Sequence, residues 1–215
     1  MQVKRITSAT LIGDVVDSRE ARDRSRLHTR LGQVLDQVNA SADPRTPLRI
    51  TLGDEYQGTF ATVGQALAAA LRLRLALLPE YDVRHGVGWG AVAVLQEEPR
   101  VEDGPGWWAA REAIDAVKRA EERPATRRRR TAYRLAERTS GPEPAAVEAA
   151  LMLRDQLVGG LSERSVSVLR ALLAGSTQRE IAEGLEITDS AVSQRVRADG
   201  LAVVVAADEL MRGLQ

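Results

Sequence analysis

The chain has 215 residues, of which 44% are hydrophobic and 28% are charged, values typical of a folded globular protein. It contains no cysteine and two histidines, which excludes disulfide frameworks, thiolate zinc sites, cysteine nucleophiles and histidine-rich metal sites. Its apolar runs are far shorter than the roughly 20 residues that cross a bilayer, and no signal core follows the N-terminal residues. We therefore expect a cytoplasmic protein of one large domain or two small ones, with no membrane partner.

The charges of the chain balance, with 30 basic and 30 acidic residues. Before Pro124 there are 17 basic and 18 acidic residues, and after it there are 13 and 12. Since neither part is strongly basic, any contact with nucleic acid must come from a local patch.

The first part of the chain alternates between strand and helix patterns. Short apolar or alternating runs indicate strands, and apolar residues at spacings of three and four indicate helices. The predicted elements are a strand at 9–12, a helix at 27–38, a hairpin at 48–62, a helix at 63–78 and a strand at 83–95. This β-α-β-β-α-β order is ferredoxin-like, so we expect an α+β domain with the first strand at the centre of its sheet. Glycines at 86, 88 and 90 indicate close approach by another group.

Two Gly-Asp pairs, at 13–14 and 53–54, each follow a predicted strand. The ferredoxin-like order brings these strand ends together, so we expect Asp14, Asp54 and Glu55 to meet at one edge of the sheet. Converging carboxylates suit Mg²⁺, which takes hard oxygen ligands and shares its shell with phosphates and water. The alternative is structural, with Asp14 capping a helix and Asp54 stabilising a hairpin turn. The other residues of this predicted ligand pocket are Ser18, Arg19 and Arg84.

Trp107 and Trp108 follow a Gly-Pro-Gly turn at the start of another predicted helix. Adjacent residues cannot share one helix face, so we expect one ring in the core and the other against a partner or ligand. The second ring is able to stack on a purine base or to fill an interface.

Four consecutive arginines at 127–130 follow a break marked by Pro124. We place them in a helical linker, residues 124–158, with Arg134 and Arg138 on the same helical side or nearby. Consecutive arginines point around most of a helix, so the run is either a solvated face or a phosphate clamp beside a DNA-reading unit.

From residue 161 onward the sequence carries a pattern of short capped helices. Ser162 caps one helix, Thr177 and Glu180 form a capping box that starts a second, and Thr188 caps a third at 189–198. Two short helices joined by a glycine turn predict a helix-turn-helix that binds double-stranded DNA. The predicted DNA contacts are Gln178, Arg179, Ser190, Ser193, Gln194, Arg195 and Arg197. The alternative is a three-helix module that binds another protein.

The last predicted helix, at 201–210, carries a run of valines that is unusual in a solvent-facing helix. It either forms a dimer interface or packs on the body of the helix-turn-helix. We expect a homodimer, because paired DNA half-sites need a protein with two-fold symmetry.

Four blocks of sequence resemble the SatD family. They lie at 12–19, 51–58, 84–90, and 103–105 with 110–113, and the resemblance covers roughly residues 9–120. Residues 161–197 resemble the helix-turn-helix of LuxR-type regulators and the fourth region of sigma factors.

A more distant resemblance is to the catalytic palm of class III nucleotide cyclases. It implies that Asp14 and Asp54 match the metal-binding acids and that Arg111 sits where a helix arginine stabilises the transition state. Trp107 and Trp108 stand where that pattern has a short apolar residue and an asparagine. The resemblance therefore implies a nucleotide or metal pocket, with Mg²⁺ as the candidate cofactor, better than it implies catalysis.

Together these features predict a ferredoxin-like α+β domain at 1–123, a helical linker at 124–158 and an all-α helix-turn-helix domain at 159–215. We expect a transcription regulator whose first domain senses a nucleotide or metal, or dimerises, and whose last domain binds DNA. The alternatives are a metal-dependent nucleotide-processing enzyme with a DNA-binding tail, and an interaction protein.

Overall fold

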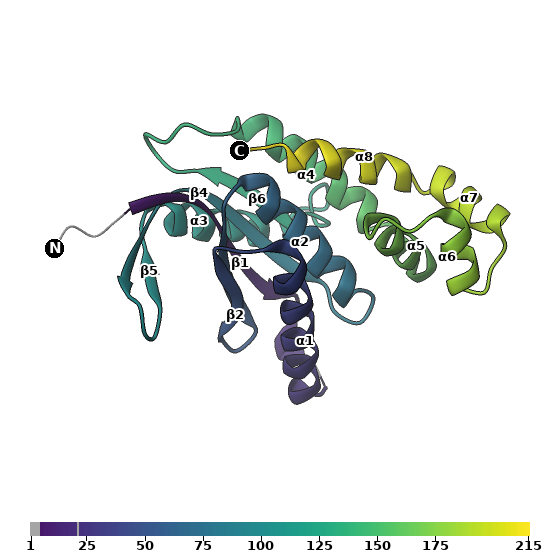
Figure 1. Cartoon of the computed structure of the whole chain (residues 1–215), viewed down its shortest axis with the longest axis horizontal. Helices are drawn as coiled ribbons and strands as arrows, with labels where there is room; N and C mark the ends of the chain where they lie inside the picture. Colours follow the sequence, from purple (N-terminus) through teal and green to yellow (C-terminus); the bar gives the residue numbers. More distant parts are fainter. Residues whose placement is uncertain (1–4, 21) are drawn as a thin grey trace.

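The centre of the protein is one mixed β-sheet, seen in a computed structural model that describes residues 5–20 and 22–215 (Figure 1). Within these residues the strand order is β2-β3-β1-β4-β5, and β6 also pairs with β4. The strands are β1 (Arg5–Val15), β2 (Thr46–Leu52), β3 (Glu55–Phe60), β4 (Val83–Gln96), β5 (Val101–Asp103) and β6 (Thr131–Leu135). The first four strands pair with one another in antiparallel fashion and β1 lies between β3 and β4, which confirms the predicted β-α-β-β-α-β unit and the α+β class.

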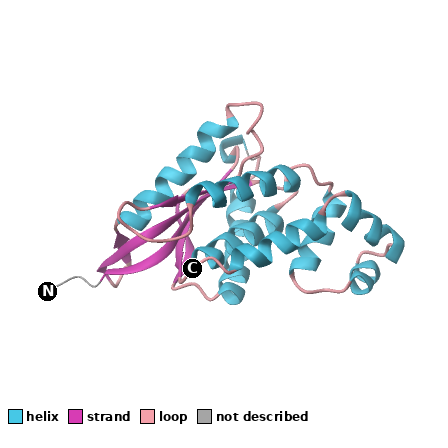
Figure 2. Cartoon of the chain, turned by 90° about the horizontal axis from the view of Figure 1, so that it is seen from above, coloured by secondary structure: helices cyan, strands magenta, loops and turns pink. Residues whose placement is uncertain are grey.

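Helices cover both faces of this sheet (Figure 2). They are the short 3₁₀ helix η1 (Ser18–Glu20), α1 (Arg24–Ala42), α2 (Val63–Leu77), α3 (Pro105–Glu121), α4 (Pro144–Val158), α5 (Glu163–Leu173), α6 (Gln178–Gly184), α7 (Asp189–Ala198) and α8 (Leu201–Arg212). The side chains of Ser162, Thr177 and Thr188 cap α5, α6 and α7 as predicted. In the described part of the chain, no helix combines the length and apolar character that crossing a membrane requires.

Glycines in β4 allow α3 to lie unusually close to the sheet. A Cβ atom at Gly86 would lie 2.3 Å from the carbonyl oxygen of Ala110, and one at Gly88 would lie 2.2 Å from that of Gly106. The Thr10 hydroxyl, on the neighbouring strand, donates to the same Gly106 carbonyl at 2.8 Å. The group predicted to approach the glycine-spaced strand is therefore the backbone of α3.

Hydrogen bonds join the segment that contains the four C-terminal helices to both ends of α2. The Arg170 guanidinium of α5 donates to the carbonyl oxygens of Leu75 at 2.6 Å and Leu78 at 3.1 Å, where α2 ends. After α8, the Leu214 carbonyl accepts a hydrogen bond from the Gly64 amide at 3.0 Å, where α2 begins. In Figure 1 α8 accordingly runs back toward the sheet.

These helices also share a core with α2. Leu71 and Leu75 are buried in one cluster with residues of α5, α6, α7 and α8, among them Val168, Val192 and Leu201. The separate all-α domain that the sequence suggested is therefore not shown, because α2 supplies part of its hydrophobic core. The proposed boundaries near residues 123 and 158 stay a prediction.

The segment predicted as a helical linker is corrected by the structure. Residues 122–128 form turns, and β6 follows at Thr131 and runs parallel to β4. The four arginines therefore do not lie on a helix, whereas the predicted helix near 145–158 is present as α4. A strand of five residues whose paired residues lie 46 positions earlier leaves no local pattern for sequence reasoning to find.

Asp155 of α4 anchors β6 to the sheet. It is 1% exposed, and its Oδ2 accepts hydrogen bonds from the backbone amides of Arg130 at 2.7 Å and Thr131 at 2.6 Å. Its Oδ1 lies 3.3 Å from Nη1 of Arg74 in α2. One buried carboxylate thus connects α4, β6 and α2.

The close approach of α3 predicts opposite effects of alanine at two glycines. Gly88→Ala places a methyl group against the α3 backbone, so we expect the free energy of unfolding to fall by about 3 kcal/mol or more. Gly32→Ala, in α1 with open space around it, should raise it by about 0.5–1 kcal/mol. Urea denaturation of both variants measures this, and a tolerated Gly88→Ala would contradict the tight contact.

Candidate functional site

A charged cleft of about 460 Å³ lies where β1 ends, beside the β2–β3 hairpin. Its walls come from β1, η1, the hairpin turn, the start of β4 and the last turns of α3. The lining residues are Asp14, Val15, Asp17, Ser18, Arg19, Glu20, Leu52, Asp54, Glu55, Arg84 and Lys118. All the residues that we assigned to the ligand pocket from the strand and turn pattern line this cleft.

Asp14 is the most constrained acid of the cleft. It is 8% exposed, and its two oxygens face two cations: Oδ1 lies 3.2 Å from Nη1 of Arg84, and Oδ2 lies 2.7 Å from Nζ of Lys118. Arg84 also donates from Nε to Glu121 at 2.8 Å. Burial opposes the charge of Arg84, but the carboxylates of Asp14 and Glu121 outweigh it and raise the pKa of this arginine.

Asp54 lies next to Asp14 because the hairpin turn folds against the end of β1. Gly53 opens the turn with a φ of +63°, a conformation that glycine adopts without strain. Oδ2 of Asp54 then accepts a hydrogen bond from the Val15 amide at 3.0 Å, one residue after Asp14. The structure thus brings the two predicted acids together, and the structural alternative for Asp54 also applies, since its carboxylate fixes the turn.

Glu55, which lines the cleft, forms a bidentate ion pair with Arg111, which does not belong to the lining. Nη1 and Nη2 of Arg111 donate to Oε2 and Oε1 of Glu55 at 2.8 and 2.7 Å. The hydrogen bonds from Arg111 lower the pKa of Glu55, with burial acting in the opposite direction. Arg111 is thus placed near the cleft but is held by a carboxylate.

A buried pair of aromatic side chains lies on the other face of the sheet, at the level of the cleft. The Tyr56 hydroxyl and the His85 Nε2 are hydrogen-bonded at 2.7 Å, and both residues are fully buried. The Tyr56 ring reaches His85 across β1 because Gly13 has no side chain: a Cβ atom there would lie 2.3 Å from the Tyr56 Cζ. Burial lowers the pKa of His85 to about 3, so the ring is neutral. The glycine of the Gly13-Asp14 pair is therefore structural.

The two tryptophans point apart, as predicted from their adjacency. Trp107 is buried against Ile12 and Ile114, whereas Trp108 is 63% exposed and its Nε1 donates to Asp103 at 3.0 Å. Trp108 lines a different pocket, beside Glu112 and Arg138, and takes no part in the cleft.

The cleft offers a donor set for one divalent cation, subject to an exchange of partners. Among residues 5–20 and 22–215 there is no group of three or more histidine and acidic side chains arranged for a metal. Mg²⁺, however, is commonly held by one or two carboxylates, with water and phosphate completing its shell. Asp14 and Asp54 are such a pair, and a cation at Asp14 must displace Lys118, whose side chain is 42% exposed. Lys118 was missed from the sequence, although it lies seven residues after Arg111 on the same helix.

The predicted DNA contacts occupy several kinds of position on α6 and α7. Gln178, Ser190, Gln194 and Arg197 are exposed, and Ser193 is half-buried. Arg179 is exposed but its Nε pairs with Glu183 at 3.0 Å. Arg195, expected to read a base, turns toward α5, where its Nη1 lies 3.5 Å from the Ser165 hydroxyl.

The fold and the cleft define an α+β protein with a polar pocket at the end of its central strand. The chain belongs to the SatD family, whose model matches residues 8–212 and thus includes the four C-terminal helices.

Comparison with individual proteins gives partial matches. Over 93 residues the chain is 36% identical to an adenosylcobinamide-GDP ribazoletransferase of Laribacter hongkongensis, and it spans about a third (35%) of that protein and 42% of itself. Among solved structures, a bacterial light-regulated adenylyl cyclase matches with a TM-score of 0.49 and 10% identity, covering 62% of this chain and 44% of that one. The guanylyl cyclase domain of RhoGC from Blastocladiella emersonii gives 0.45 and 16%, covering 54% and 78%.

The neutral, buried His85 predicts how stability depends on pH. An unfolded chain binds a proton at this histidine below pH 6.5, whereas the folded chain does so only near pH 3, so stability falls as the pH drops through this range. His85→Gln removes this titration. The difference in unfolding free energy between the native chain and the variant should therefore shrink below pH 6.5, by up to about 1.4 kcal/mol per pH unit. Urea denaturation between pH 7 and 4.5 measures it, and a constant difference would show that the folded and unfolded chains bind the His85 proton over the same pH range.

Proposed function

We propose that the cleft at the end of β1 binds a nucleotide together with a divalent cation and acts on its phosphates. The observation that carries this proposal is the meeting of Asp14 and Asp54, with Arg84 and Lys118 beside them, in one pocket. Carboxylates for a cation and cations for an anion are the two halves of a metal–phosphate site. The sequence resemblance to the cyclase palm implies the same two acids as metal ligands.

Each side chain has a separate role in this proposal. Asp14 and Asp54 hold the cation, which supplies charge neutralisation at the phosphates. Arg84 stays in place, because Glu121 and Asp14 fix its guanidinium from two sides. Lys118 would have to release Asp14 for a cation to bind there, and its ammonium group would then be free to contact a phosphate oxygen.

Arg111 is the candidate for stabilising charge in the reaction. Its bidentate bond to Glu55 must open before its guanidinium can reach a substrate. Binding therefore uses Asp14, Asp54 and Lys118, whereas turnover also needs the release of Arg111 from Glu55.

A homodimer is also part of this proposal. Leu201, Val204 and Met211 of α8 pack on the body of the protein, whereas Val203 and Leu210 are 63% and 80% exposed. The valine run thus serves intramolecular packing on one side and leaves apolar side chains on the other for a second copy.

DNA binding through α6 and α7 is a second candidate function. It is favoured by two short capped helices with exposed Gln178, Ser190 and Gln194. The charge of this region favours nucleotide binding over DNA binding. Residues 161–215 contain six arginines and eight carboxylates, whereas DNA-binding units are usually basic. The anchoring of α5–α8 to α2 also limits their freedom to dock as an independent reader.

The role of Lys118 as a competitor of the cation predicts opposite effects of two substitutions on metal binding. Asp14→Asn should weaken Mn²⁺ binding about tenfold or more, since it removes a ligand charge. Lys118→Met should strengthen it, because the ammonium group no longer occupies Asp14. Titration of Mn²⁺ by calorimetry measures both, with Asp36→Asn on the exposed face of α1 as the control. Equal affinities in all four proteins would exclude a metal at Asp14.

The same proteins test the nucleotide. ATP or GTP should bind to the native chain in Mg²⁺ and lose most of that affinity in EDTA or in Asp14→Asn. Product formation that is lost in Arg111→Ala, with binding retained, would assign turnover to Arg111. Binding without any product would limit the function to sensing.

The DNA candidate predicts binding that weakens with salt, because phosphate contacts release counterions. Fluorescence anisotropy on the upstream region of its own gene, beside an unrelated duplex, measures it. Arg197→Ala should lower the affinity, while Arg195→Ala should act through the packing of α7 on α5. No binding at low salt would remove this candidate and leave the nucleotide proposal intact.

A further inference from the structure

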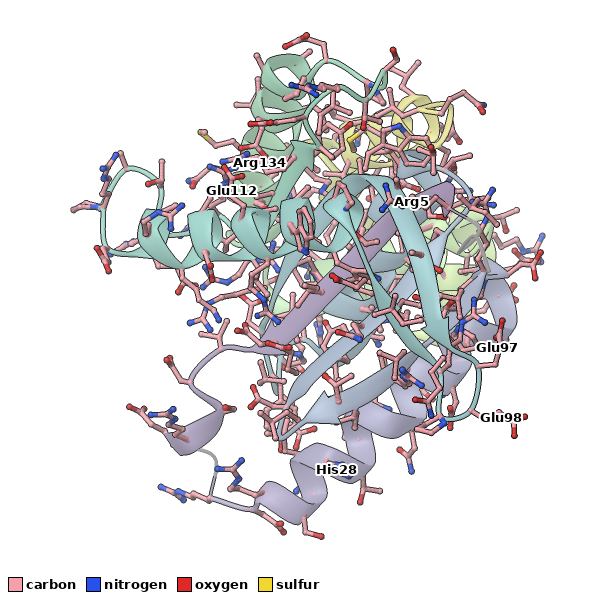
Figure 3. All side chains as sticks on the ribbon, turned by 90° about the vertical axis from the view of Figure 1, so that its left-hand side faces the viewer. Arg5, His28, Glu97, Glu98, Glu112 and Arg134 are labelled. Atoms are coloured by element: carbon pink, nitrogen blue, oxygen red, sulfur yellow. The ribbon has the colours of Figure 1, made fainter. Side chains whose placement is uncertain are left out.

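Two arginines of the run form ion pairs within the fold, and the guanidinium groups of the other two do not. Arg129 forms an ion pair with Glu148, and Arg130 pairs with Asp82 and Glu121 at 2.7 and 2.9 Å. Arg134, further along, pairs with Glu112 and Glu148, and Figure 3 shows Glu112 and Arg134 side by side. Within residues 5–20 and 22–215, by contrast, the guanidinium groups of Arg127 and Arg128 have no hydrogen bond or ion pair.

Hydrogen bonds hold in place the loop that carries Arg127 and Arg128. Arg130 donates from Nη1 to the carbonyl oxygens of Arg127 and Arg129, both at 2.9 Å, and so holds the backbone of the run in one conformation. Thr126 closes the loop on the end of α3 by donating to the Ala120 carbonyl at 2.8 Å. The side chain of Arg128 packs against Gly159 and Gly160, and a side chain at either glycine would contact it. Binding here would therefore require little ordering of the backbone.

A pocket of about 480 Å³, within the range of small-molecule sites, lies directly at these arginines. It is lined by Pro124, Ala125, Thr126, Arg127, Arg128, Arg129, Met152, Leu153 and Gln156. No carboxylate belongs to this lining, and with Arg129 neutralised by Glu148 the two remaining guanidinium charges are uncompensated. In a chain of net charge zero, such an imbalance marks a site for an anion.

The opposite wall of this pocket is apolar. Met152 and Leu153 of α4 are 39% and 69% exposed. A thioether and a branched aliphatic side chain favour contact with an aromatic or aliphatic group, and guanidinium groups also stack on aromatic rings. The pocket therefore matches a ligand that is anionic at one end and apolar at the other.

We propose that the pocket between the arginine loop and α4 binds a small phosphate ester of nucleotide size, with its phosphates on Arg127 and Arg128 and its ring against Met152 and Leu153. This site is separate from the cleft at β1, since the two pockets have no lining residue in common. It needs no divalent cation, because the arginines themselves neutralise the phosphates.

The test uses the full chain in EDTA, which disables the metal-dependent cleft. ADP and pyrophosphate are titrated by calorimetry into the native protein, the double variant Arg127→Gln/Arg128→Gln, Asp14→Asn and the control Arg5→Gln. Arg5 is exposed at the far end of β1, where it pairs with Ala93, away from β6 (Figure 3). ADP should bind to the native chain, Asp14→Asn and Arg5→Gln alike. The double variant should bind it about tenfold more weakly or worse, with an unchanged melting temperature.

The apolar wall supplies a second readout. ADP should bind more tightly than pyrophosphate, and Leu153→Ser should reduce that preference while leaving pyrophosphate binding unchanged. Unaltered ADP binding in the double variant would overturn the proposal. Loss of the binding in Asp14→Asn alone would overturn it too, and would place the nucleotide in the cleft. Binding of a DNA duplex through the same arginines, with ADP failing to bind, would replace it with a nucleic-acid contact.

Discussion

The buried carboxylate of Asp155 holds the C-terminal part of the chain to the sheet. It is almost completely buried, and it binds the start of β6 through two backbone amides and α2 through Arg74. Arg74 continues to Asp82 at the start of β4, and Arg130 joins Asp82 to Glu121 at the end of α3. Removing one member of such a network leaves a buried charge without a partner, which costs about 3–5 kcal/mol. The segment after residue 124 is therefore built into the sheet.

Glycines determine the spacing of the layers on each side of this network. Gly86 and Gly88 let the α3 backbone lie against β4, and this brings Lys118 within reach of Asp14. On the other face, Gly13 lets the Tyr56 ring cross β1 to His85. A side chain at Gly86 or Gly88 would lift α3 from the sheet and move Lys118 away from Asp14, whereas a side chain at Gly13 would displace the Tyr56 ring. The geometry of the cleft thus depends on glycines in the strands beside it.

Sequence reasoning succeeded where the determinants are local. The caps at Thr177 and Thr188 and the apolar period of α1 fixed these helices to within a few residues, and the β-α-β-β-α-β order placed Asp14 beside Asp54. It failed where partners are distant in the chain. The paired residues of β6 and β4 are 46 positions apart, and Arg170 binds the carbonyl of Leu75, 95 positions earlier. The helix caps that suggested a helix-turn-helix report helix starts, and they carry no information about whether the surface is basic enough for DNA.

Although the net charge of the chain is zero, its two pockets are lined by opposite excess charge. The cleft at β1 is lined by five carboxylates and three cationic side chains, so an anionic nucleotide is repelled until a divalent cation has entered. The pocket at the arginine loop is lined by arginines and no carboxylate, so it attracts the same anion without a metal. In the two proposals the sites therefore differ in their dependence on divalent cations and not in the class of ligand. Glu121 pairs with both Arg130, which follows the loop pocket, and Arg84, which lines the cleft, so a single carboxylate lies between the two regions although it lines neither pocket.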